Sequence, residues 1–136
     1  MNLIVFDLEW NIGYKPKTFR YHGAELTLRG EIIQIGAVRI NERAEVLDTF
    51  EMTLRPRIFR KLQHHIAKVT GLTQGDLESG VPIAEGLARF VQWAGDSENM
   101  LISYTLKAQD GTARSGYFWY NCITKEADGL LELGRE

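Results

Sequence analysis

Residues 3–10 read Leu-Ile-Val-Phe-Asp-Leu-Glu-Trp, and this stretch decides the expected fold because an apolar run ends in two carboxylates. An unbroken run of aliphatic and aromatic residues is typical of a buried β-strand. Side chains alternate between the two faces of a strand, so Asp7 and Glu9 point to the same side, about 7 Å apart along the chain. Leu3 and Val5 precede them on that face. The strand is therefore expected to pass from a core into an acidic site.

The two carboxylates at the end of this strand favour a bound cation. Asp7 and Glu9 would repel each other and resist desolvation unless a positive charge lay between them. Mg²⁺ or Mn²⁺ is the natural candidate, because such hard cations favour oxygen ligands. The alternative is a strand that simply ends in solvent with two charged residues.

Two further strands follow from the pattern of apolar residues. After a polar loop, residues 31–40 are apolar on both faces, which predicts a central strand covered on two sides. Gly36 within it is expected to leave room for a neighbouring element, and Glu31 is interpreted as a charge at the strand's start. Residues 46–54 predict a third strand.

An amphipathic helix is predicted from Pro82, and Gly95 ends it. Its expected core-facing stripe is formed by Ile83, Leu87, Phe90, Val91 and Ala94. Trp93 is expected to pack on the edge of the sheet. Before this helix, Thr73 and Asp76 have the spacing of a capping box, so Asp76 is interpreted as a helix cap rather than a catalytic residue.

Taken together, these segments resemble the DEDD family of 3′-to-5′ exonucleases, which includes polymerase proofreading domains, oligoribonuclease and ribonuclease T. The segments that carry the resemblance are IVFDLEW, EIIQIGAVRI, LRPR, HIAKVTGLTQGDL and PIAEGLARFVQWAGD, and they cover about residues 1–104. The resemblance implies an α/β fold of the ribonuclease H-like kind, a mixed sheet with flanking helices, in which four acidic residues hold two metal ions. Asp7 and Glu9 match the first motif of the family.

The resemblance also implies a substrate, the 3′ end of a single-stranded nucleic acid. By analogy with the family, the backbone near Leu8 and Trp10 contacts the terminal nucleotide. His65 and Ile66 stand where family members line the nucleotide pocket, which makes them candidate substrate contacts. The alternative for His65 and its neighbour His64 is that both are ordinary surface histidines.

The pattern changes after Tyr104. The family's second acidic motif follows within a few residues of this point, but the next aspartate here is Asp110, the candidate for a further metal ligand and catalytic residue. Residues 105–136 contain no His-x-x-x-x-Asp or Tyr-x-x-x-Asp. The expectation is one exonuclease-like domain over residues 1–136 whose C-terminal part, from 105 onward, is incomplete, truncated or altered.

Composition is that of an ordinary globular protein. The chain has 136 residues, 44% of them hydrophobic, which excludes wholesale disorder. The single cysteine, Cys122, excludes an internal disulfide and suits the reducing cytoplasm. Asp7 interrupts the N-terminal apolar run, so we expect neither a signal peptide nor a membrane partner.

Charge is distributed unevenly along the chain, although the net charge is only −2. No acidic residue occurs between positions 52 and 75, and none occurs between 12 and 24. The cations of these two segments are Lys15, Lys17, Arg20, Arg55, Arg57, Arg60, Lys61 and Lys68. This asymmetry favours a phosphate-binding surface, and its alternative is a solvated basic face.

Two functional classes remain open. The first is a metal-dependent exonuclease that cleaves DNA or RNA phosphodiester bonds, and the second is a non-catalytic remnant or nucleic-acid-binding module with the same fold. The four aromatic residues 117–120 leave a further choice between packing into the chain's own core, stacking on bases and self-association with a second copy.

Overall fold

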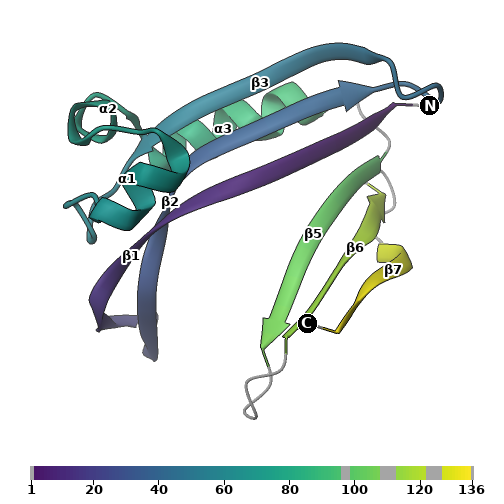
Figure 1. The fold of residues 1–136 in the computed structure, drawn as a ribbon. Coiled ribbons are helices and arrows are strands. Elements are labelled where there is room, and N and C mark those ends of the chain that lie inside the picture. The colour runs from purple at the N-terminus through teal and green to yellow at the C-terminus, as the bar shows by residue number, and fades with distance from the viewer. Residues whose placement is uncertain (1, 96–98, 108–112, 122–126, 136) are drawn as a thin grey trace. The chain divides into compact units, whose positions relative to one another are not determined.

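The computed structural model describes residues 2–95, 99–107, 113–121 and 127–135 (Figure 1). In chain order the strands and helices are β1 (Leu3–Tyr21), β2 (Ala24–Ile40), β3 (Val46–Arg55), α1 (His64–Thr70), α2 (Gln74–Glu78), β4 (Val81–Pro82), α3 (Ile83–Ala94), β5 (Asn99–Lys107), β6 (Ala113–Asn121) and β7 (Ala127–Arg135). Among the described residues, no helix has the length and apolar character needed to cross a membrane.

The strands form a mixed sheet, as the sequence predicts. Hydrogen-bonded neighbours follow the order β4-β3-β2-β1-β5-β6-β7. β1 runs parallel to β5 in the register Leu3 to Asn99, and β3 runs parallel to β4 in the register Leu54 to Val81. The pairs β5–β6 and β6–β7 are antiparallel. Parallel and antiparallel pairs in one sheet with helices define the expected α/β class.

The chain divides into two compact units. The first consists of residues 1–7, 36–50 and 90–136, and the second of residues 8–35 and 51–89. The second unit therefore contains most of β1 and β2, the end of β3, the segment between β3 and α1, both short helices, β4 and the first part of α3.

Aromatic rings form the core of the first unit. The ring of Phe90 lies 5.5 Å from that of Phe6 and 5.4 Å from that of Phe50, measured between centroids. The ring of Trp93 lies 5.4 Å from that of Phe50, and the Arg39 guanidinium lies 4.8 Å from the centroid of Trp93. Asp48 accepts hydrogen bonds from both Arg39 Nε, at 2.9 Å, and Trp93 Nε1, at 3.1 Å. Trp93 thus packs on side chains of β2 and β3.

In the second unit α3 packs on β3 through a glycine. A Cβ added to Gly86 would lie 2.2 Å from Leu54 Cδ2 and 3.2 Å from Met52 Sδ, so only a bare Cα fits. This approach sets which face of α3 is covered. Leu87 is 41% exposed and Val91 is 66% exposed, so their expected place in the core-facing stripe is wrong.

The polar loop expected before residue 31 is instead a β-hairpin. β1 continues to Tyr21 and β2 begins at Ala24, so the two strands form a long two-stranded arm. The connecting residues His22 and Gly23 have φ values of 48° and 79°. Positive φ at both central positions defines a type I′ turn, whose twist matches that of the flanking strands.

Two local predictions have opposite outcomes. Thr73 and Asp76 form the predicted capping box of α2, and the backbone N–H and hydroxyl of Thr73 hold the pKa of Asp76 below its ordinary value. At Gly36, in contrast, an added Cβ would meet no atom of the described residues within 4 Å. The expected close approach of another element at Gly36 is therefore wrong.

Candidate metal and nucleic-acid site

Asp7 and Glu9 lie on the continuous strand β1, so their proximity follows from the strand itself. Asp7 is exposed and Glu9 is partly exposed. Strand alternation directs both side chains to one face. Within the part of the chain that the structure describes, no hydrogen bond or ion pair engages either carboxylate. Two solvent-accessible carboxylates without partners among the described residues fit the oxygen ligands of a hard cation.

These two carboxylates are a pair of donors rather than a complete set of ligands. Across residues 2–95, 99–107, 113–121 and 127–135, no three His, Cys, Asp or Glu side chains gather as a metal site would require. Asp110, the expected further ligand, lies outside the described residues. The described chain thus presents Asp7 and Glu9 alone as candidate metal ligands on β1.

Asn11 organises the segment beside this strand, and sequence reasoning missed it. Its side chain is fully buried. The Asn11 amide Nδ2 donates to the carbonyl of Phe59 at 2.7 Å and to that of Lys61 at 2.9 Å, while Oδ1 accepts from the N–H of Gln63 at 3.1 Å. One side chain therefore uses two donors and one acceptor to clamp residues 59–63 against β1.

The sequence offered one signal for this role of Asn11, which is its residue type. Asparagine is depleted in strands, and a buried amide requires hydrogen-bond partners. An asparagine that follows an apolar strand is therefore a candidate for such a clamp. Its partners cannot be found from the sequence, because they lie 48 to 52 residues further along the chain.

The Asn11 clamp brings the start of α1 beside the predicted substrate contacts on β1. Gln63 is the N-cap residue of α1, and Trp10 directly precedes Asn11. Trp10 is 46% exposed. Leu8 is partly exposed, His65 is exposed and Ile66 is partly exposed. The segment that carries Leu8 and Trp10 and the segment that carries His65 and Ile66 are thus tied together by one buried residue between them.

Glu31 holds the first half of the same loop. Its carboxylate accepts hydrogen bonds from three successive backbone N–H groups, those of Arg57 at 3.0 Å, Ile58 at 2.7 Å and Phe59 at 2.6 Å. Bonds from N–H groups to a charged acceptor are stronger than those between neutral groups. The interpretation of Glu31 as a strand-edge charge was therefore incomplete, because the residue fixes the backbone that carries Arg57 and Arg60.

Replacement of Glu31 by alanine is expected to lower the free energy of unfolding by about 2–4 kcal/mol, since three N–H groups lose a charged acceptor. The loop should also open locally, so that trypsin cleaves faster after Arg57. Urea denaturation and timed proteolysis measure the two effects. Glu51→Ala, which removes an exposed strand glutamate whose one bond is 3.4 Å long, is the matched control. Equal proteolysis of the two variants would contradict the role of Glu31.

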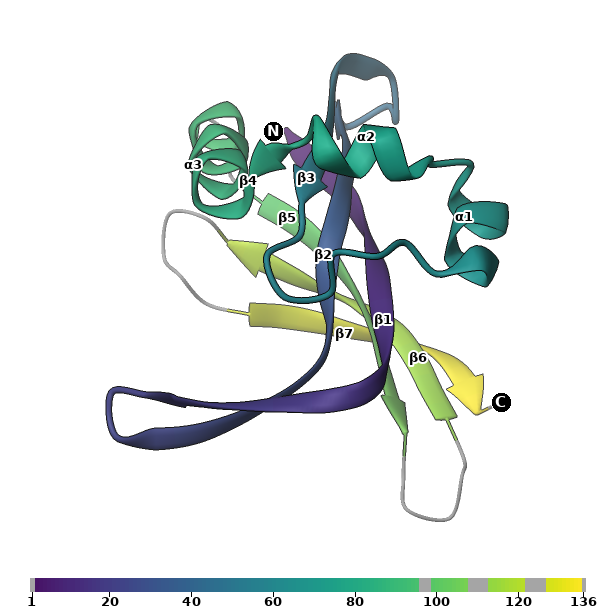
Figure 2. The same cartoon turned by 90° about the vertical axis from the view of Figure 1, so that its left-hand side faces the viewer.

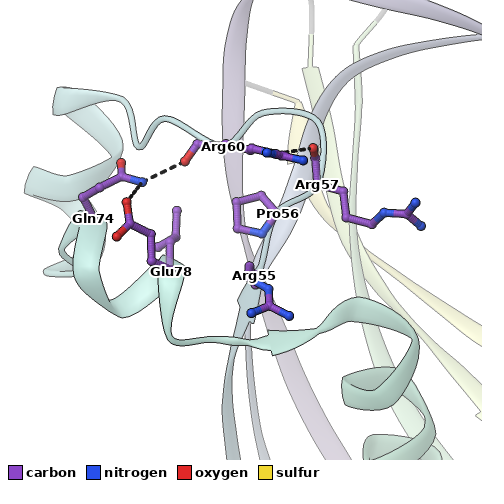
Figure 3. A pocket seen from close by; sticks show the side chains of 7 residues that line it. Arg55, Pro56, Arg57, Arg60, Gln74 and Glu78 are labelled. Carbon is purple, nitrogen blue, oxygen red and sulfur yellow. Dashed lines mark hydrogen bonds between the residues drawn. The ribbon is translucent and has the colours of Figure 1, made fainter.

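A pocket of about 420 Å³ lies between this loop and α2 (Figure 3). Its lining consists of Arg55, Pro56, Arg57, Arg60, Gln74, Leu77 and Glu78. Gln74 donates to the carbonyl of Arg60 at 2.9 Å and accepts from the N–H of Leu62 at 2.8 Å. Three arginines around one concavity fit an anionic ligand such as a phosphate, although Glu78 offsets part of their charge.

The class of this protein follows from comparison with known families. A family model described as Exonuclease, of the RNase T type, matches residues 4–109. The protein therefore belongs to this exonuclease family, and the resemblance to the DEDD exonucleases is confirmed. A comparison with curated proteins gives no significant match.

Solved structures share the fold. The nuclease domain of 3′hExo, a DEDDh family member bound to rAMP, matches with a TM-score of 0.55 and 23% identity over 69% of this chain and 44% of that chain. A 3′-exonuclease in a structure of histone mRNA stem-loop recognition matches with a TM-score of 0.55 and 22% identity, over 69% and 30% of the two chains. Cell-death related nuclease 4 matches with a TM-score of 0.53 and 19% identity, over 68% and 29%. The present chain spans less than half the length of each of these proteins.

Proposed function

We propose that this protein has the function of a metal-dependent 3′-to-5′ exonuclease for single-stranded nucleic acid, with Asp7 and Glu9 as metal ligands, and that the 136-residue chain alone cleaves little because two carboxylates do not complete a two-metal site. The observation that carries the proposal is the pair of solvent-accessible carboxylates on β1, which matches the first acidic motif of the family to which the chain belongs. Asp110 is proposed as a further oxygen ligand.

Each proposed residue has a separate role. Asp7 and Glu9 would hold Mg²⁺ or Mn²⁺, which stabilises charge on a phosphodiester and lowers the pKa of bound water. The backbone near Leu8 and Trp10 would position the terminal nucleotide. His65 and Ile66, whose helix starts at the Asn11 clamp, would close the other side of that nucleotide.

A calorimetric titration with Mn²⁺ tests the ligand pair. The wild-type chain is expected to bind weakly, and the Asp7→Ala, Glu9→Ala double variant is expected to bind at least about tenfold more weakly, because affinity follows the number of charged ligands. The matched control is Glu25→Ala, Glu51→Ala, which removes two exposed carboxylates from β2 and β3. Equal affinity in all three proteins would refute the assignment.

A second candidate function is nucleic-acid binding without cleavage. The observation that favours it is the basic lining of the pocket between the 55–60 loop and α2, which is built independently of Asp7 and Glu9. In that case the Asp7→Ala, Glu9→Ala variant would bind an oligonucleotide as well as the wild type does, and neither protein would shorten it.

A further inference from the structure

The two faces of the β1–β2 arm differ in charge. Thr18 Oγ1 and Thr27 Oγ1 lie 3.1 Å apart across the two strands, so these threonines mark one face. Strand alternation places the other residues of the arm on one face or the other. The threonine face carries Tyr14, Pro16, Arg20, Glu25 and Arg29, and the opposite face carries Lys15, Lys17, Phe19, Tyr21, Leu26 and Leu28. The arm's one acidic residue, Glu25, thus lies away from the lysines.

The opposite face, called here the lysine face, is open to solvent along its whole length. Every residue from position 14 to position 29 is exposed. Phe19 is 38% exposed and Tyr21 is 63% exposed, while Leu26 and Leu28 are 45% and 36% exposed. β1 and β2 carry this face as far as the His22–Gly23 turn (Figure 2). Exposed aromatic rings next to unopposed cations are what single-stranded nucleic acid requires of a binding surface.

A basic groove continues the lysine face toward the clamped loop. The groove has a volume of about 420 Å³ and lies between residues 13–17 of β1 and residues 58–63. Its charged lining is formed by Lys15, Lys17, Arg60 and Lys61, with no acidic residue. Lys17 Nζ donates to the carbonyl of Ile58 at 3.3 Å and lies 5.7 Å from the centroid of the Phe59 ring, so it also fastens the arm to the loop.

We propose that the lysine face and this groove form one track for single-stranded nucleic acid, in which Lys15, Arg60 and Lys61 bind phosphates and Phe19 and Tyr21 stack on bases. This inference rests on the proposed function, because it assigns a binding surface for the part of the substrate away from its reacting end. Lys15 follows Glu9 by six residues of strand, a distance of about 20 Å. The track therefore holds nucleotides remote from the carboxylate pair.

The positive charge and the exposed rings of the lysine face and groove determine which ligand binds there. A face with cations and no carboxylate attracts a polyanion, and each phosphate contact releases counterions. Exposed rings add stacking energy only with unpaired bases, which selects single strands over duplexes. A second copy of the chain, whose net charge is −2, would be drawn to the lysines more weakly than a chain of phosphates.

Fluorescence anisotropy of a 5′-labelled single-stranded 12-mer in EDTA tests the phosphate contacts separately from metal binding. Replacing Lys15 and Lys61 by alanine is expected to weaken binding and to reduce the slope of log K against log salt by about 1.4, since each contact on a single strand contributes about 0.7. The matched control is Arg20→Ala, Arg29→Ala, which removes two cations from the threonine face of the same arm. Equal losses in both variants would mean that net charge, not the track, binds the strand, and would overturn the proposal.

The rings are tested in the same assay with Phe19→Ala, Tyr21→Ala. Affinity is expected to fall at least about fivefold for each ring, with the salt slope unchanged, because stacking releases no counterions. Circular dichroism checks that each variant keeps its secondary structure. Unchanged affinity of the Phe19→Ala, Tyr21→Ala variant for the 12-mer would refute the track, and so would equal competition by a duplex for the wild-type protein. A third refuting result is a variant that loses a dimer in sedimentation but still binds the 12-mer normally. Failure of Mn²⁺ binding in calorimetry, by contrast, would refute the proposed metal ligands and leave this result intact.

Discussion

Incubation of the 136-residue chain with a 5′-labelled oligonucleotide and Mn²⁺ is expected to give little or no stepwise shortening from the 3′ end. Asp7 and Glu9 supply two carboxylates, whereas two-metal catalysis holds a pair of ions about 3.5–4 Å apart and needs further ligands. Residues 105–136 carry neither of the family patterns that would supply a general base. Positioned proton transfer contributes about 10²–10⁴-fold to rate, so the expected deficit is large.

The gel assay needs a control for contaminating nucleases. Asp7→Ala serves this purpose, because any shortening that persists in that variant comes from another protein. Robust stepwise shortening by the wild type that disappears in Asp7→Ala would contradict the prediction. Such a result would mean that Asp110 or a residue of a second chain completes the set of ligands.

Replacement of Asn11 by alanine is expected to lower the free energy of unfolding by about 3–5 kcal/mol. The change leaves the carbonyls of Phe59 and Lys61 and the N–H of Gln63 without their buried partner, and each orphaned group costs about 1–3 kcal/mol. The clamped segment should then loosen. Because the segment lines the basic groove, binding of the 12-mer in EDTA should weaken as well.

Two comparison variants sharpen this test. Asn11→Asp keeps the acceptor for Gln63 but replaces the amide nitrogen, which donates to two carbonyls, by one carboxylate oxygen that faces both carbonyl oxygens, so it should destabilise at least as much as alanine. Ile12→Ala changes the neighbouring residue, which is 47% exposed, and should cost about 1 kcal/mol or less. Urea denaturation of all three variants measures the differences. A loss for Asn11→Ala no larger than that for Ile12→Ala would contradict the clamp.

Patterns confined to one segment were predictable from the sequence. The strands around residues 3–9 and 31–40, the helix ending at Ala94 and the Thr73–Asp76 cap all follow from neighbouring side chains. Family resemblance supplied the rest of the fold class. The exposure of Leu87 and Val91 was not predictable, because it depends on how closely Gly86 approaches Leu54, a residue of another element.

The candidate site was predictable only where it lies on one strand. Asp7 and Glu9 were found because their spacing is local. Asn11 and Glu31 were missed or undervalued, since their partners lie 48 to 52 and 26 to 28 residues away. A side chain that acts through distant backbone groups leaves no periodic signal in the sequence.

The arm was misread for a different reason. Pro16 argues against a strand, because proline donates no hydrogen bond to a sheet and is confined to edges and bulges. In a two-stranded arm each strand has one edge free of partners, so Pro16 is tolerated there. The His22–Gly23 turn also lacks the Asn-Gly or Asp-Gly signal of common hairpins, although histidine is among the residues that accept positive φ.

Because side chains alternate along each strand of the arm, the number of residues in a strand determines which side chains share a face. One residue inserted between Asn11 and Lys15 would shift the rest of β1 by one position, so that Phe19 and Tyr21 turned away from the groove, toward the face that carries Glu25 on β2. A pair of residues, one added to each strand near the His22–Gly23 turn, would lengthen the arm and leave its faces as they are. Variation in the size of this arm among related chains is therefore expected to proceed in matched steps across the hairpin, with odd insertions disfavoured near its base.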